Sequence, residues 1–159
     1  MRKKSKYKPR PVLRDCMAFI KTGFAPVREQ SETLTLRMKN HASLEEITKG
    51  RANKGHVDIM IVALNMTEAL AMVREDLGAD WRGEIRAAQD ALFAMAQRGV
   101  ATGRWLFTGP ELTAVNLAME LHDAQLDACT VDELQKAIEL SKRIIRAGKA
   151  RVIDSGVAA

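Results

Sequence analysis

Residues 57–73 read VDIMIVALNMTEALAMV, and nearly every position in this stretch is apolar. The polar exceptions are Asp58, Asn65, Thr67 and Glu68. A helix that buries one stripe keeps polar residues on its opposite face, whereas a helix that is apolar all round is buried on several faces. We therefore predict a central helix from about Lys54 to Leu77, ended by Gly78 and covered by other elements on more than one side.

The composition of the whole chain favours a helical domain around this core. The 159 residues are 47% hydrophobic, 28% charged and only 4% aromatic, and sheets rely more on aromatic and β-branched residues. We predict an all-α fold, a compact bundle of about six helices with an extended basic N-terminal arm and a basic C-terminal tail. The arm covers residues 1–11, a single helical domain residues 12–148, and a basic and then bland tail residues 149–159.

Capping residues and glycines predict the limits of the other helices. Thr108-Gly-Pro-Glu and Thr130-Val-Asp-Glu have the spacing of a capping box, which opens a helix. A glycine just past a helical pattern marks the end of that helix. The remaining helices are expected over residues 13–22, 34–48, 81–98 (with Asp80 as N-cap), from the Thr108 box to 128, and 131–147.

The segments between these helices, and the faces they bury, can also be predicted. Residues 24–32 read as a loop, and residues 99–109 as a mobile or extended connector anchored by Trp105 and Phe107. Residues 34–38 alternate like a strand as well as fitting a helix. The expected buried positions are Leu34, Met38, Leu44 and Ile47 in the second helix, and Ile85, Ala88, Leu92 and Met95 in the fourth.

Membrane and export signals are weak in this sequence. The apolar run from Ile59 to Val73 is interrupted by polar residues and is too short to span a bilayer. Charged residues at positions 14–21 break up what would have to be a signal-peptide core. Two cysteines, Cys16 and Cys129, make no disulfide framework or zinc cluster. We expect a cytoplasmic protein that does not associate with membranes.

The net charge of +5 is concentrated at the two ends of the chain. Residues 11–141 contain 14 basic and 19 acidic residues, so the body of the protein is acidic. The basic residues of the arm are Arg2, Lys3, Lys4, Lys6, Lys8 and Arg10. Those of the tail are Lys142, Arg143, Arg146, Lys149 and Arg151.

Basic ends of this kind predict contact with the backbone of DNA or RNA, in which each neutralised phosphate releases counterions. Tyr7 is expected to stack on a base, and Pro9 and Pro11 to keep the arm extended. The basic turn with Lys49, Arg51 and Lys54 is a second candidate for backbone contact, or an ordinary solvated loop. The arm itself has an alternative role as a solvated terminus or as a segment docked on the acidic body.

Three sets of residues invite a catalytic interpretation. They are His122 with Asp123; the stripe of Asn116, Glu120, Asp123 and Asp127; and Asn65 with Glu68 inside the apolar helix. A carboxylate in such a helix needs a partner, and the candidates are Arg86, Arg104 and His122. The structural interpretation is a buried polar network of Asn65, Glu68, Asn116 and His122. The alternatives are a small polar pocket between the third and fifth helices, a divalent-cation site on the stripe, and a general base at His122.

No phosphate-binding loop, nucleophile elbow or His-Glu-x-x-His motif is present in the sequence. We therefore predict no catalytic residues, no metal and no cofactor.

Four stretches of the chain are also similar to known sequences. They are Lys-Lys-x-Lys-Tyr-Lys-Pro-Arg at the start, Lys39-Asn40-His41, residues 63–70 and residues 119–125. They resemble a family of small, basic-ended proteins encoded by bacteriophages and prophages of Gram-negative bacteria. The resemblance implies a phage-encoded accessory protein in the bacterial cytoplasm and carries over no catalytic residues.

The sequence thus predicts a non-enzymatic protein that binds the nucleic-acid backbone through its basic termini. The alternative is a protein-binding module, either a homo-oligomer or an inhibitor of a host protein. Its motivation is a surplus of apolar residues that suit an interface, namely Met60, Met66, Met72, Trp105 and Phe107.

Overall fold

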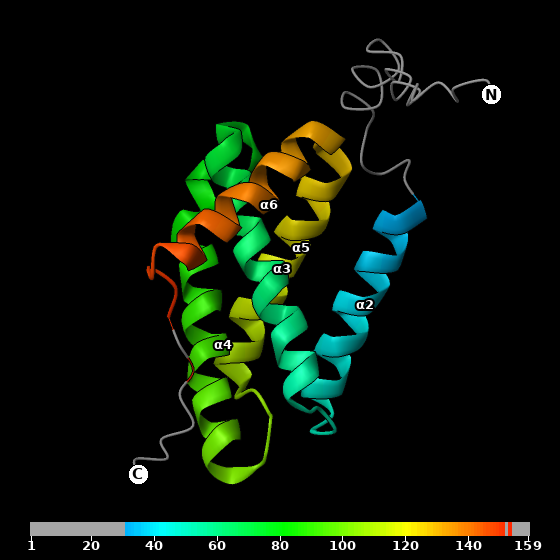
Figure 1. The fold of residues 1–159 in the computed structure, drawn as a ribbon. Helices are drawn as coiled ribbons and strands as arrows, with labels where there is room; N and C mark the ends of the chain where they lie inside the picture. The colour runs from blue at the N-terminus through cyan, green and yellow to red at the C-terminus, as the bar shows by residue number, and fades with distance from the viewer. Residues whose placement is uncertain (1–30, 152, 154–159) are drawn as a thin grey trace, which may run out of the picture.

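The computed structural model describes residues 31–151 and 153, and the described part is an all-helical bundle (Figure 1). Its elements are α2 (Ser31–Thr48), α3 (Lys54–Val73), the 3₁₀ turns η2 (Glu75–Leu77) and η3 (Ala79–Trp81), α4 (Arg82–Thr102), α5 (Gly109–Ala128) and α6 (Val131–Arg146). The predicted all-α class is confirmed. The predicted arm at residues 1–11 and the helix at residues 13–22 lie outside the described residues.

Helix α3 is the central element, as its sequence predicts. It packs against α2, α4, α5 and α6 (Figure 1). Met60, Leu64 and Leu70 are completely buried on it, and full burial of such a side chain contributes about 1.5–3 kcal/mol. The helix ends at Val73 and not at Leu77, because Arg74 is extended and a 3₁₀ turn follows. Gly78 closes that turn with a φ of 132°.

Helix α3 also satisfies a membrane criterion. Among the described residues it is the one helix that is long and apolar enough to cross a bilayer by length and composition. The expectation that the apolar stretch is too short is therefore wrong, because the helix containing it has 20 residues. Four helices cover it, which is the environment of the core helix of a bundle.

Helix α2 begins earlier than predicted and buries a different face from the one expected. It begins at Ser31, within the predicted loop, and the stretch that alternates like a strand is helical. Leu44 and Ile47 are buried as predicted, but Leu34 and Met38 are 64% and 65% exposed. The inner face of the helix instead includes a polar residue, Asn40, which is 2% exposed.

Helix α4 is longer than predicted at its C-terminal end. Asp80 lies in η3 and Trp81 is the N-cap, without a side-chain hydrogen bond to the helix. The helix continues through Gly99 and ends at Gly103, whose φ is 72°. Gly99 is buried beneath the indole of Trp105, and a Cβ atom at Gly99 would overlap that ring. Gly99 is thus a contact site for the connector and not a helix stop.

This contact predicts that Gly99→Ala lowers stability. Alanine normally stabilises a helix interior by about 1 kcal/mol relative to glycine. At this position the displaced indole costs about 1–3 kcal/mol, so we expect a net loss of up to about 2 kcal/mol in urea denaturation. The matched control is Gly83→Ala in the same helix, where a Cβ atom meets nothing within 4 Å. Equal stability of the two variants would contradict the contact.

The helices α5 and α6 begin where their capping boxes predict. Thr108 N–H donates to Glu111 at 2.8 Å, and Thr130 N–H donates to Glu133 at 2.8 Å. Helix α6 ends at Arg146 and Gly148 follows with a φ of 67°. Both helix starts are thus determined by interactions within four residues, which explains why the sequence predicts them.

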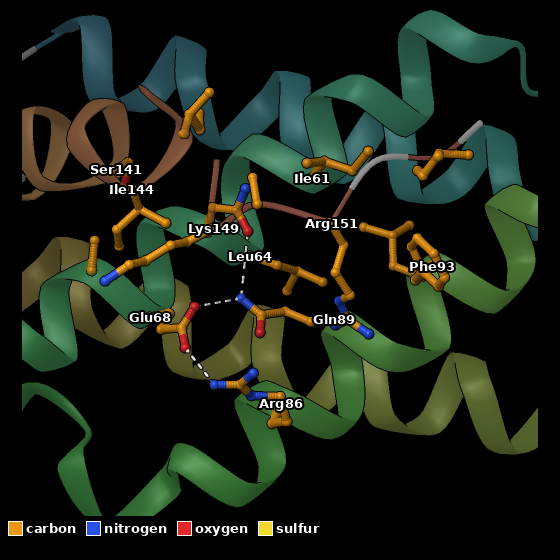
Figure 2. Close-up of a pocket in the computed structure, with 16 residues that line it drawn as sticks. Ile61, Leu64, Glu68, Arg86, Gln89, Phe93, Ser141, Ile144, Lys149 and Arg151 are labelled. Atoms are coloured by element: carbon orange, nitrogen blue, oxygen red, sulfur yellow. Dashed lines mark hydrogen bonds and ion pairs between the residues drawn. The ribbon is translucent and has the colours of Figure 1, made fainter. Parts of the chain in front are cut away.

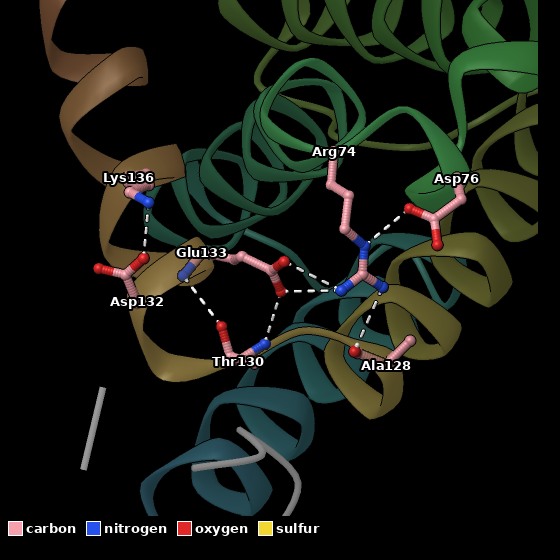
Figure 3. Close-up of polar contacts among 7 residues, drawn as sticks. All are labelled: Arg74, Asp76, Ala128, Thr130, Asp132, Glu133 and Lys136. Carbon is pink, nitrogen blue, oxygen red and sulfur yellow. Dashed lines mark hydrogen bonds and ion pairs between the residues drawn. The ribbon is translucent and has the colours of Figure 1, made fainter. Parts of the chain in front are cut away.

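Arg74 fastens the end of α3 to the start of α6 (Figure 3). It donates to both carboxylate oxygens of Glu133 at 3.0 Å and to Asp76 at 2.7 Å. Burial alone would raise the pKa of Glu133, but hydrogen bonds from the Thr130 backbone and from Arg74 lower it below its ordinary value. Glu133 therefore serves both as a capping residue and as the ionised partner of Arg74.

Candidate functional site

The described helices balance their own charge. Residues 31–151 contain 16 basic and 17 acidic residues, whereas residues 1–30 contain 9 basic and 2 acidic residues. Twelve ion pairs are formed within the described part of the chain. The net positive charge of the protein therefore belongs to its first 30 residues.

The three predicted nucleic-acid contacts in the turn before α3 are paired. Lys49 binds Glu45, Arg51 binds Glu46 at 2.5 Å, and Lys54 binds Asp58 at 3.0 Å. His56, from the same basic region, forms a reciprocal cap with Asn53 at the start of α3. Exposed pairs contribute little stability, but they leave this turn without an excess of positive charge.

The basic residues of the C-terminal end differ from one another in their contacts. Lys142 binds Glu139 at 3.2 Å, and Arg151 binds Asp90 at 2.6 Å while its guanidinium lies 5.0 Å from the Phe93 ring centre. The other three form no ion pair within residues 31–151; they are Arg143, Arg146 and Lys149. Arg143 and Arg146 lie in the last turn of α6, where the helix dipole favours positive charge.

The predicted buried polar network is two separate groups, and of its four members only His122 is buried, whereas Asn65 and Glu68 are partly exposed. In the first, Glu68 binds Arg86 at 3.2 Å and accepts from Gln89 at 2.9 Å. Gln89 also donates to Asn65 at 3.4 Å. Arg86 is thus the partner that Glu68 requires, and this group joins α3 to α4.

The second group surrounds His122 on α5. Its Nε2 atom lies 3.4 Å from the side-chain nitrogen of Asn40 on α2, and its Nδ1 atom has no partner in the described structure. Burial lowers the pKa of His122 to about 4. Asn116 is exposed on the same helix, so its assignment to a buried network is wrong.

The acidic stripe of α5 is covered in part by α2. Arg37 binds Asp127 at 2.7 Å and the backbone oxygen of Asp123 at 2.9 Å, and His41 binds Asp123 at 2.7 Å. No group of three or more His, Cys, Asp or Glu side chains in the described part is placed to hold a metal ion. The stripe is therefore a docking face for a neighbouring helix of the same chain.

A groove brings together two sets of residues that the sequence singles out. It is a cavity of about 210 Å³ between α3, α4, α6 and the segment that follows α6 (Figure 2). Its lining includes Asn65 and Glu68 from the polar group and Lys149 and Arg151 from the basic tail. The expected polar pocket between the third and fifth helices is thus wrong in its placement, because the third, fourth and sixth helices form this groove.

Several lining residues carry no signal in the sequence. Gln89 and Phe93 of α4 and Ser141 of α6 fit an ordinary amphipathic pattern, and only the packing of these helices places them beside α3. Gln125 on α5 also has a structural role that carries no signal in the sequence. It is 1% exposed and donates to the backbone oxygens of Thr67 and Leu77 at 2.9 and 2.6 Å.

In comparisons with protein families, curated proteins and solved structures, nothing matches the chain.

Proposed function

We propose that the protein is a non-enzymatic nucleic-acid-binding protein whose basic ends contact the phosphate backbone of DNA or RNA. The observation that supports this most is the separation of charge along the chain. The described helical part is close to neutral and pairs most of its cations internally, whereas residues 1–30 carry a net charge of +7. Residues 1–10 hold six basic residues and no acidic one, and such uninterrupted charge of one sign is the electrostatic pattern of backbone binding.

The C-terminal end of α6 extends this proposal to the described part of the protein. Arg143 and Arg146 lie in the last turn of α6 and Lys149 follows the helix; all three are exposed and form no ion pair within the described residues. They are available to phosphates at no cost of breaking existing pairs. Lys49, Arg51 and Lys54 would have to give up their carboxylate partners, so we assign them a smaller contribution.

Neutralisation of the arm in the full chain tests the proposal. Replacing its six basic residues by glutamine removes up to six phosphate contacts, and we expect affinity to fall by at least about tenfold at low salt. The measurement is fluorescence anisotropy with labelled DNA and RNA, single- and double-stranded. The control replaces Lys39, Arg82 and Arg104, three exposed cations outside the basic ends. Unchanged affinity of the arm variant would contradict the proposal.

A second candidate function, a protein-binding module, is supported by the outer face of α2. Leu34 and Met38 are each about two-thirds exposed there and are one turn apart. Met60 and Phe107, two residues that suggested an interface, belong instead to the core. Leu34→Lys with Met38→Lys would convert a self-associating protein to a monomer in sedimentation equilibrium. An unchanged mass of the variant, or a monomeric wild-type protein, would exclude self-association through α2.

A further inference from the structure

We propose that the groove between α3, α4 and α6 binds one unpaired nucleobase, with the attached phosphate held by Lys149, a rim cation that forms no ion pair within the described residues. This inference rests on the proposed nucleic-acid function and assigns it a site that the basic arm does not provide. The groove lies entirely within the described residues, and three observations support it.

The first observation is the size and character of the cavity. A volume of about 210 Å³ exceeds the roughly 150 Å³ of an apolar protein cavity that holds benzene. It is smaller than the pockets of about 300 Å³ or more that take drug-sized ligands. Apolar side chains form much of its wall, among them Ile61, Leu64 and Ile144. Its dimensions therefore suit one aromatic ring system.

The second observation is an open donor and acceptor on the groove wall. The Glu68 carboxylate only accepts hydrogen bonds, so Gln89 must turn its amide nitrogen toward it. The same nitrogen donates to the side-chain oxygen of Asn65, which fixes that amide as well. The Asn65 nitrogen and the Gln89 oxygen then make no hydrogen bond within the described residues, and neither is buried. One donor and one acceptor are what the edge of a nucleobase requires.

The third observation is the charge and stacking surface at the rim. Arg151 lies against the Phe93 ring, and Arg86 binds Glu68 (Figure 2). Guanidinium planes and aromatic rings are the surfaces on which single-stranded bases stack. Arg86 and Arg151 are paired with Glu68 and Asp90, so the additional charge of Lys149 makes the rim positive and favours an anionic ligand. A neutral peptide would leave that excess charge unmatched, and we therefore favour a nucleotide.

The test compares binding to a short single-stranded oligonucleotide with binding to an abasic backbone of equal length. For the full-length wild-type protein, we expect the abasic strand to bind about tenfold more weakly. Gln89→Leu should lower affinity for the base-bearing strand to the abasic level. The matched control, Gln97→Leu, lies on the exposed side of the same helix and should have no effect. Equal affinity of the wild-type protein for both strands would overturn the proposal.

A second measurement does not depend on any variant or on the arm. Nucleoside monophosphates added to the full chain should shift the methyl NMR signals of Ile61 and Ile144, and not that of Ile47, which lies in the core away from the groove. Unshifted signals would overturn the groove assignment. Shifts produced by an uncharged blocked peptide but not by nucleotides would overturn it in favour of a peptide site. Loss of oligonucleotide binding on arm neutralisation, with no methyl shift, would retain the proposed function and reject only the groove.

Discussion

Gln125→Glu is expected to lower the free energy of unfolding by about 3–5 kcal/mol at neutral pH. The Gln125 side chain is buried between α5, α3 and η2, where its amide nitrogen satisfies two backbone oxygens, those of Thr67 and Leu77. A carboxylate would withdraw both donors and place its negative charge beside those oxygens. The substitution preserves the size of the side chain, so the effect isolates hydrogen bonding and charge from packing.

Urea denaturation provides the measurement, and Gln97→Glu on the exposed side of α4 provides the control. We expect the control to change stability by less than about 0.5 kcal/mol. Gln125→Leu, which leaves the two oxygens unsatisfied without adding charge, should cost an intermediate amount of about 2 kcal/mol. A Gln125→Glu protein within about 1 kcal/mol of wild type would show that this amide does not hold the three elements together.

The second large effect is a loss of stability in mild acid caused by His122. Burial lowers its pKa to about 4 in the folded protein. The charge of Asp123 raises this pKa, whereas the charges of Arg37 and His41 lower it further. The unfolded chain binds this proton below a pH of about 6.5, whereas the folded protein does not bind it until about pH 4. Stability therefore falls as pH falls across this window, by about 2 kcal/mol between about pH 7 and pH 5.

Chemical denaturation at several pH values above about pH 5 tests this, because carboxylates contribute little there. His122→Gln should abolish most of the pH dependence, whatever its effect on absolute stability. The control is His41→Gln, which removes a half-exposed histidine from the adjoining helix and should retain the slope. A wild-type protein equally stable at both ends of the window would show that His122 does not titrate as an isolated buried group.

Local signals explain the parts of the fold that could be predicted. The capping box of Thr130 and Glu133 lies within a single turn, and the apolar excess of α3 is a property of consecutive residues. Neither depends on a partner elsewhere in the chain. The helical class, the central helix and the starts of α5 and α6 could therefore be predicted without knowledge of the packing.

The remaining features depend on contacts between distant residues. Gly99 resembles a helix stop because nothing in the sequence shows that Trp105 folds back over it. Leu34 and Met38 were expected to be buried because they are apolar. They are exposed because the inner face of α2 includes a polar residue, Asn40, which meets His122. The burial of Gln125 cannot be seen in the sequence, because the two backbone oxygens that accept its hydrogen bonds are 58 and 48 residues away along the chain.

The groove, too, is formed by residues that are distant in the sequence. Asn65 and Glu68 stand out in the sequence because they are polar within an apolar helix. The Gln89 amide that joins them, and the Lys149 and Arg151 cations at the rim, come from other elements. The sequence thus indicates one wall of the candidate site, and only the packing of α4 and α6 completes it.

The salt dependence of nucleic-acid binding by the full-length protein shows whether its basic arm contacts phosphates. If the six arm cations each contact a phosphate, the slope of log affinity against log salt for a single strand should be about −4 from the arm alone. Affinity should then fall by about two orders of magnitude between about 50 and 200 mM salt, and the glutamine-substituted arm should lose most of that slope. A wild-type protein that binds neither DNA nor RNA at the lower salt concentration would contradict the account.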